Sequence, residues 1–205
     1  MKRVVVTGLG LVTPLGCGVN HSWDNLLSGI SGVKKITKFD PINHKCKVAC
    51  EVPLGSAIDG KFNPEEWIEK KEIKKIDDFI QFSMAASEQA FLDSKIQIST
   101  ELSLRSGAII GSGIGGLPGI ERAALDYYVN KKKISPFFIT GRLINMAAGY
   151  ASLKYNLKGP NYATVSACAS GAHAIGESVR LIQSGKMDLM LTGGTEDAIS
   201  PLGIE

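Results

Sequence analysis

The stretch between residues 162 and 191 restricts the fold of this chain more than any other segment. Residues 162–167 are mostly apolar or β-branched, residues 169–184 carry small and apolar side chains, and residues 187–191 are apolar again. This order predicts a strand, a helix and a second strand. Strands joined by helices are typical of a parallel sheet, because parallel neighbours need a long crossover connection. We therefore expect an α/β fold, with a largely parallel sheet and covering helices.

Other segments repeat the alternation of strand and helix. Residues 31–75 interrupt it, since three prolines and an irregular pattern predict a surface excursion, with a strand near residues 47–52. The apolar spacing of residues 77–94 predicts an amphipathic helix. The expected strands are residues 3–9, 106–110, 162–167 and 187–191, and the expected helices are residues 22–28, 77–94, 120–129, 141–155 and 169–184.

Composition narrows the class of protein. The 205 residues are 44% hydrophobic and 21% charged, and 23 basic against 20 acidic side chains leave a net charge of +3. Such a balance predicts a globular domain, or a piece of a larger one, without a nucleic-acid or membrane footprint. The lysine run at residues 131–133 is expected to face solvent, or to meet an acidic partner. The chain lacks an apolar run of membrane-spanning length and a signal-peptide pattern, so a cytoplasmic protein with reduced cysteines is expected.

Cys168 lies where an expected strand meets an expected helix, and its neighbours are small. Residues 167 and 169–171 are alanine, serine or glycine, which leaves the thiol open to a substrate. A helix N-terminus has unpaired N–H groups and a positive dipole end, and both stabilise a thiolate. The Cys168 N–H would also point at an oxyanion forming on the substrate. Cys168 is therefore the candidate nucleophile, and the alternative is a small thiol buried between strand and helix.

The histidines offer this thiol no obvious base. His173 follows Cys168 by five residues, which is about 140° around a helix. We therefore expect His173 to pack or hydrogen-bond within the fold. His21 and His44 lie in the N-terminal part of the chain, and nothing in the sequence ties them to Cys168.

Two glycine-rich segments only partly match nucleotide-binding turns. In the first, residues 6–10, Thr13 stands in place of the third glycine. The second, residues 111–116, satisfies G-x-G-x-x-G, but Pro118 delays the helix that should follow, and Asp126 falls in a helical pattern rather than at a strand end. Close backbone packing is the expected use of these glycines, and no cofactor is expected.

A metal site is not expected either. His44, Cys46 and Cys50 would share one face of a strand, but Cys46 and Cys50 would then lie about 13 Å apart. One zinc ion cannot bridge that distance.

Seven segments together resemble the β-ketoacyl-acyl-carrier-protein synthases, and within them the type II bacterial enzymes. The resemblance runs along the whole chain in order, although Thr140-Gly141-Arg142 departs from the residues usual in the family. The segments that carry it are residues 4–10, 13–16, 111–116, 134–138, 166–171, 193–196 and 201–203.

This resemblance implies a thiolase-like fold of two similar α/β halves that works as a homodimer, with residues 1–205 as its N-terminal half. It implies that Cys168 accepts an acyl chain from acyl carrier protein. A malonyl-carrier protein then loses CO₂, and its carbanion attacks that acyl group and lengthens it by two carbons. Ile114 would line and partly gate the acyl tunnel, and Phe138 would reach it from across the dimer interface. The substrate-binding positions so implied are Gly113, Ile114, Phe138, Ala167 and Gly203.

The resemblance also indicates what this half would lack. The decarboxylating histidine pair, a supporting lysine and a second oxyanion-hole N–H belong to the C-terminal half of the family. We therefore expect this chain alone to be acylated at Cys168 without condensing. Two other interpretations remain open: a non-catalytic thiolase-fold subunit or interaction fragment, and a related enzyme that uses coenzyme A thioesters.

Overall fold

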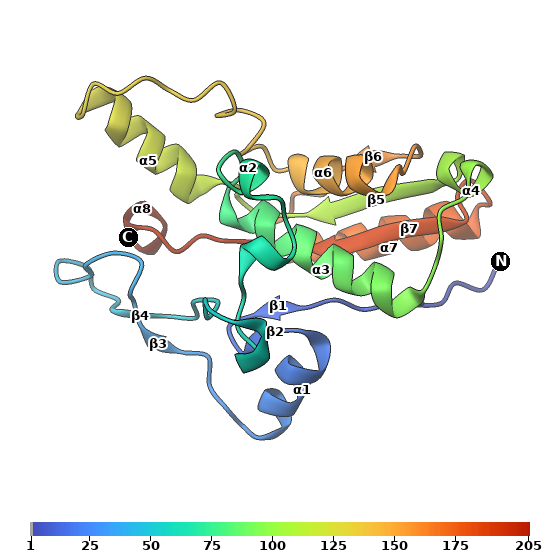
Figure 1. The fold of residues 1–205 in the computed structure, drawn as a ribbon, viewed down its shortest axis with the longest axis horizontal. Coiled ribbons are helices and arrows are strands. Elements are labelled where there is room, and N and C mark those ends of the chain that lie inside the picture. The colour runs from blue at the N-terminus through green and yellow to red at the C-terminus, as the bar shows by residue number, and fades with distance from the viewer. Residues whose placement is uncertain (1) are drawn as a thin grey trace.

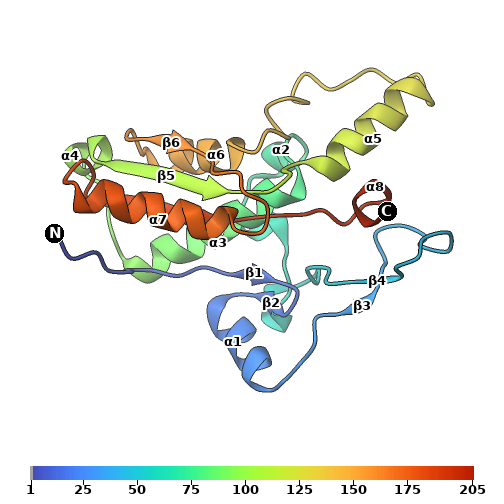
Figure 2. The ribbon, with the colours of Figure 1, turned by 180° about the vertical axis from the view of Figure 1, so that it is seen from behind.

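The chain is described by a computed structural model, which covers residues 2–205. Its centre is a three-stranded parallel sheet in the order β6-β5-β7, formed by Asn161–Tyr162, Ser106–Gly111 and Leu189–Gly194. Helix α7 (Ser170–Gln183) packs on one face, and α6 (Met146–Tyr155) with its neighbour α3 (Asp78–Ser94) packs on the other (Figures 1 and 2). The predicted α/β fold with a parallel sheet and covering helices is confirmed.

Strand β5 lies at the centre of the core, and all six of its residues are buried. Ala108 and Ile110 pack among α3 and α6. Because side chains alternate along a strand, Ile109 faces the opposite layer, where α7 lies, and it is fully buried as well. Burial on both faces is typical of a strand inside a parallel sheet.

The bounds of helix α3 are predicted correctly, but its predicted amphipathic pattern of exposure is not observed. It runs over Asp78–Ser94, yet every residue from Phe79 to Ala85 is buried, so its first two turns have no solvent-facing side. Amphipathic spacing predicts that one face of α3 is exposed to solvent. The N-terminal segment and residues 48–62 cover that face instead (Figure 1). Only its C-terminal half is partly exposed.

The prediction of a buried strand at residues 3–9 is wrong. The segment is extended but pairs with no strand in the described part of the chain, and Val5 and Val6 are 57% and 78% exposed. It runs along α3 instead, where the Leu9 N–H donates to the Asp93 carboxylate at 2.9 Å. A Cβ on Gly10 would lie 1.9 Å from the Ala86 carbonyl oxygen, so glycine permits this close approach.

Other predicted elements are shorter or shifted. The excursion carries one small antiparallel pair, residues 34–35 with residues 48–49, and the predicted strand at residues 162–167 is reduced to β6, after which the Thr164 carbonyl oxygen still accepts from the Ser112 N–H at 3.4 Å. The remaining elements are β1 (Val12–Thr13), β2 (Gly16–Cys17), α1 (Val19–Leu27), β3 (Lys34–Lys35), β4 (Val48–Ala49), the 3₁₀ turns Ala57–Asp59 and Pro64–Glu66, α2 (Lys70–Ile73), α4 (Thr100–Leu104), α5 (Leu117–Tyr128) and α8 (Pro201–Ile204).

Helices α1, α5 and α6 correspond to the predicted helices 22–28, 120–129 and 141–155, with starts that differ by three to five residues. Among residues 2–205, the structure contains no helix that is both long and apolar enough to cross a membrane.

Candidate functional site

The thiol of Cys168 is exposed, as its small neighbours predict. A strand does not lead directly into it, however. Ala167 adopts φ +51°, a left-handed conformation that is uncommon for residues other than glycine, and Ala169 then caps α7. Cys168 therefore stands on a sharp turn just before a helix of 14 residues, near its positive dipole end.

The side chain of Ser170 holds this turn together. Its hydroxyl donates to the Ala167 carbonyl oxygen at 2.7 Å and accepts from the Ser166 N–H at 2.9 Å. The Ser170 carbonyl oxygen accepts from the Thr164 hydroxyl at 2.7 Å. Ser170 is only 3% exposed, so these bonds are shielded from water. They offset the strain of the left-handed alanine.

Glycines allow the surrounding backbone to pack directly on this turn. A Cβ on Gly111 would lie 2.4 Å from the Ser170 carbonyl group, and one on Gly171 would lie 3.1 Å from the Gly194 Cα atom. Gly113 sits next to Ala167, because a Cβ added to Gly113 would lie 3.5 Å from the Ala167 Cα atom. The expectation that the 111–116 glycines serve close packing is confirmed.

His173 is held by a neighbour of Cys168 rather than by the thiol. Its Nδ1 atom lies 2.6 Å from the Ser166 hydroxyl oxygen, which confirms that it hydrogen-bonds within the fold. A surface groove of about 480 Å³ runs beside this pair, between the Thr164–Ser166 segment and one side of α7. The groove therefore lies beside the turn that carries Cys168, although Cys168 is not among its lining residues in the described chain.

The other predicted substrate-binding residues lie on three different elements. Ile114 follows Gly113 in the glycine turn, and its side chain is 47% exposed. Phe138 lies in the loop between α5 and α6, where the Arg142 guanidinium sits 5.7 Å from its ring centroid. Gly203 lies in α8, which packs against α5. The structure brings Gly113 next to Ala167, although the two residues lie more than 50 positions apart in the chain.

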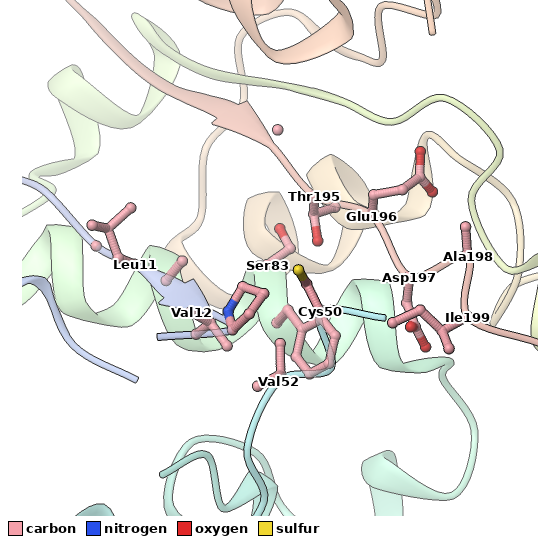
Figure 3. A pocket seen from close by; sticks show the side chains of 15 residues that line it. Leu11, Val12, Cys50, Val52, Ser83, Thr195, Glu196, Asp197, Ala198 and Ile199 are labelled. Carbon is pink, nitrogen blue, oxygen red and sulfur yellow. The ribbon is translucent and has the colours of Figure 1, made fainter. Parts of the chain in front are cut away.

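A separate cavity of about 270 Å³ lies between the N-terminal segment, α3 and the residues after β7 (Figure 3). Cys50 contributes its sulfur to this lining, whereas Cys168 is not among the lining residues within the described chain. The cavity is therefore distinct from the thiol site. Residues 2–205 hold no cluster of histidine, cysteine and carboxylate side chains that fits a metal ion.

A mostly buried ion pair borders the same cavity. The Lys38 ammonium lies 2.7 Å from the Asp197 carboxylate and 3.3 Å from that of Asp78. Burial acts to lower the pKa of Lys38, but the hydrogen bonds and charges of both carboxylates outweigh it, so the pKa is raised. This pair connects the 31–75 excursion to the end of β7.

Sequence reasoning assigned no separate role to Ser112, Ser170 or Glu196, which bind the turns around Cys168 through their side chains. Ser170 sits in the first turn of a helix, where short polar side chains commonly bond to local backbone. The position of Ser170 in the sequence therefore indicates that its hydroxyl can bond to nearby backbone groups. The partner of Glu196 lies more than 80 residues away, and no local pattern predicts it.

Comparisons with known proteins match residues 1–205 to the family described as "Beta-ketoacyl synthase, N-terminal domain". Similar curated proteins include the 3-oxoacyl-[acyl-carrier-protein] synthase 2 of Rhizobium meliloti, which is 47% identical over an alignment of 208 positions that covers 100% of this chain and 49% of that protein. The enzyme of the same name from Coxiella burnetii is 47% identical over 205 residues, covering 99% of this chain and 48% of that protein. The chain spans about half the length of these relatives.

Solved structures share the fold. A β-ketoacyl synthase from Burkholderia phymatum superposes with a TM-score of 0.80 at 29% identity, over 98% of this chain and 48% of that one. The ishigamide ketosynthase/chain length factor superposes with a TM-score of 0.83 at 24% identity, with the same coverage of both chains.

Proposed function

This chain belongs to the β-ketoacyl synthase family, whose N-terminal domain it matches, and on that premise we propose that Cys168 is the acyl-accepting nucleophile of a fatty-acid condensing enzyme. The observation that carries the proposal is the exposed Cys168 thiol, held on a hydrogen-bonded left-handed turn at the start of α7. A thiol that only filled space between strand and helix would be buried.

The proposed first step is transfer of an acyl group between sulfur atoms. The Cys168 thiolate attacks the carbonyl carbon of an acyl-carrier-protein thioester and forms a new C–S bond. The tetrahedral intermediate collapses, the bond to the carrier sulfur breaks, and the carrier thiolate leaves and takes up a proton. The N-terminal end of α7 stabilises the attacking thiolate, and the Cys168 N–H stabilises the oxyanion.

The second step belongs to the proposal for the whole protein. Malonyl-carrier protein loses CO₂, and its carbanion attacks the acyl-Cys168 carbonyl, which releases the thiolate and lengthens the acyl chain by two carbons. We assign residues 1–205 to the N-terminal half of that enzyme. An acyl carrier protein as partner, a homodimer and a cytoplasmic location belong to the same proposal.

The substrate-binding roles of Gly113, Ile114, Phe138, Ala167 and Gly203 are part of it as well. Ile114 is the best supported of them, because its exposed side chain lies one residue from Gly113, which packs on Ala167. Apolar groups suit this role, since each buried methylene of an acyl chain contributes about 0.8 kcal/mol.

The test is to incubate the chain with acyl carrier protein that bears an acyl thioester. Intact-mass and peptide mass spectrometry then detect the acylated chain. We expect a single acyl adduct on the peptide that contains Cys168, and the same peptide modified by the cysteine-directed inhibitor cerulenin. Cys168→Ser should lose both adducts. Cys46→Ser/Cys50→Ser should keep them, and this double variant is the matched control because both of its thiols are also exposed.

Other outcomes would favour the alternative functions. Folded protein without any adduct at Cys168 would support a non-catalytic thiolase-fold subunit. Faster acylation by a coenzyme A thioester than by the carrier-protein thioester of the same acyl group would support a coenzyme A-dependent relative.

A further inference from the structure

The carboxylate of Glu196 binds the glycine turn that faces Cys168. Glu196 lies two residues after β7, and its Oε2 atom accepts from the N–H groups of Gly113 at 2.6 Å and Ile114 at 3.1 Å. Its Oε1 atom accepts from the Ser112 hydroxyl at 3.0 Å. The Ser112 oxygen in turn accepts from the Gly115 N–H at 3.1 Å. One side chain thus binds a turn more than 80 residues away.

The glycine turn that Glu196 binds also packs against Ala167 in the turn that carries Cys168. A Cβ on Gly113 would lie 2.8 Å from Glu196 Oε2 and 3.5 Å from the Ala167 Cα atom. Gly113 therefore lies close to both the carboxylate and the residue that precedes Cys168. Backbone N–H groups bonded to a charged oxygen make strong contacts, so the carboxylate defines where the Ile114 backbone lies.

The neighbouring carboxylate serves a different purpose. Asp197 pairs with Lys38, whereas in the described chain the hydrogen bonds of Glu196 all go to residues 112–114. Figure 3 shows the two carboxylates pointing to opposite sides of the chain after β7. The alternation of an extended segment thus separates an ion-pairing residue from one that binds backbone.

We propose that Glu196 is a positioning residue that fixes the Ile114 side chain relative to the Cys168 thiol and thereby sets which acyl lengths reach the thiol. This inference rests on the proposed function for its acyl substrates, whereas the anchoring of the glycine turn stands apart from it. Glu196 acts through the backbone of residues 113 and 114 and does not itself contact the thiol.

Two substitutions separate the effect of the hydrogen bonds that Glu196 accepts from the effect of its negative charge. Glu196→Ala removes all three hydrogen bonds. In Glu196→Gln the amide oxygen can still accept from both backbone N–H groups, although the Ser112 hydroxyl loses its acceptor. Glu65→Ala serves as the control, because Glu65 is a half-exposed glutamate that pairs with Lys70 away from Cys168.

The first readout is acylation of Cys168 by carrier proteins that bear short and long acyl groups. We expect Glu196→Ala to change the ratio of long-chain to short-chain rates by about tenfold, the scale of losing bonds to a charged group. Alkylation of Cys168 by iodoacetamide, which needs no tunnel, should change less than about twofold. Glu196→Gln should restore most of the ratio. Equal losses with every acyl length and with iodoacetamide would overturn the inference.

The second readout is hydrogen exchange of the Gly113 and Ile114 amides by NMR. Exchange should accelerate in Glu196→Ala and stay near the original rate in Glu196→Gln and Glu65→Ala. Unchanged protection in Glu196→Ala would refute the anchor even if Cys168 is acylated. Lost protection in a protein whose Cys168 is never acylated would refute the proposed function and leave the anchor standing.

Discussion

The Ser170 hydroxyl donates a 2.7 Å hydrogen bond to the carbonyl oxygen of Ala167, the residue with a left-handed backbone directly before Cys168. An alanine costs about 1 kcal/mol or more in that conformation, so the turn needs bonds that hold it. The geometry of the thiol therefore depends on a serine two residues further along the chain.

Ser170→Ala should lower the free energy of unfolding by about 1–2 kcal/mol, because the Ser166 N–H loses its acceptor inside the protein. It should also slow alkylation of Cys168 by iodoacetamide. Adding Ala167→Gly should recover part of both losses, since glycine adopts positive φ without strain. Urea unfolding and alkylation rates measure these effects.

A serine in the same helix provides the control. Ser178 is equally buried, but its hydroxyl has no hydrogen-bond partner in the described chain. Ser178→Ala should therefore leave stability unchanged within about 0.5 kcal/mol or increase it. If both alanine variants unfold alike, the Ser170 hydrogen bonds do not stabilise the turn.

Gly111→Ala should destabilise the chain by about 3 kcal/mol, because the new methyl group would overlap the Ser170 backbone at 2.4 Å. The first turn of α7 must then shift, and Cys168 alkylation should slow. Thermal unfolding and the same alkylation assay measure both effects.

Gly176→Ala is the matched control for a glycine change on α7. Apart from the backbone of its own helix and its chain neighbours, a Cβ at Gly176 would meet no described atom within 4 Å, and this residue lies in the helix interior. Alanine there should raise the free energy of unfolding by about 0.5–1 kcal/mol. Destabilisation by Gly176→Ala would show that another surface covers this side of α7.

Lys38→Met should destabilise the chain by about 3 kcal/mol, because it leaves the buried Asp197 carboxylate without its cation. The double variant Lys38→Met/Asp197→Asn should recover much of that loss, since it removes the uncompensated charge. Urea unfolding of the original chain, Lys38→Met, Asp197→Asn and the double variant forms a complete double-mutant cycle. Simple addition of the two single effects would contradict direct coupling of these residues.

Glu88 should make the chain sensitive to acid. Burial acts to raise its pKa, but bonds from the Lys154 ammonium at 2.6 Å and the Tyr155 hydroxyl at 2.5 Å outweigh it, so the pKa is lowered. The charged form thus favours the folded state. This stabilisation is present above the unfolded pKa of about 4.3 and is lost as pH falls through the lower folded value.

Glu88→Gln removes the carboxylate charge, so comparing this variant with the original chain measures how much the charged Glu88 side chain stabilises the folded state. Urea unfolding at pH 7 should show the original chain to be more stable than the variant, and the gap should narrow as pH falls below about 4.3. A gap that stays constant down to pH 3 would show that Glu88 has the same pKa folded and unfolded.

The local sequence pattern correctly predicted the helices and strands whose formation depends mainly on nearby residues. Helices α3 and α7 and strand β5 lie within a few residues of their predicted bounds, because helical spacing and a short apolar run between breakers are local signals. Residues 3–9 have an equally strong strand pattern, but a strand requires a partner, and the pattern does not indicate whether one is present.

For the candidate site, the sequence by itself determined that Cys168 has small neighbours, that a helix follows it and that the glycine turns pack closely. Ser170 lies only three residues from Ala167, so a bond between them is a local feature, whereas only the tertiary structure decided that Glu196 binds the turn at Gly113 and that this turn packs on Ala167. The physical reason is distance along the chain. Side-chain size and helical period act between near neighbours, whereas a carboxylate finds amides 80 residues away only after the sheet has brought β5 and β7 side by side.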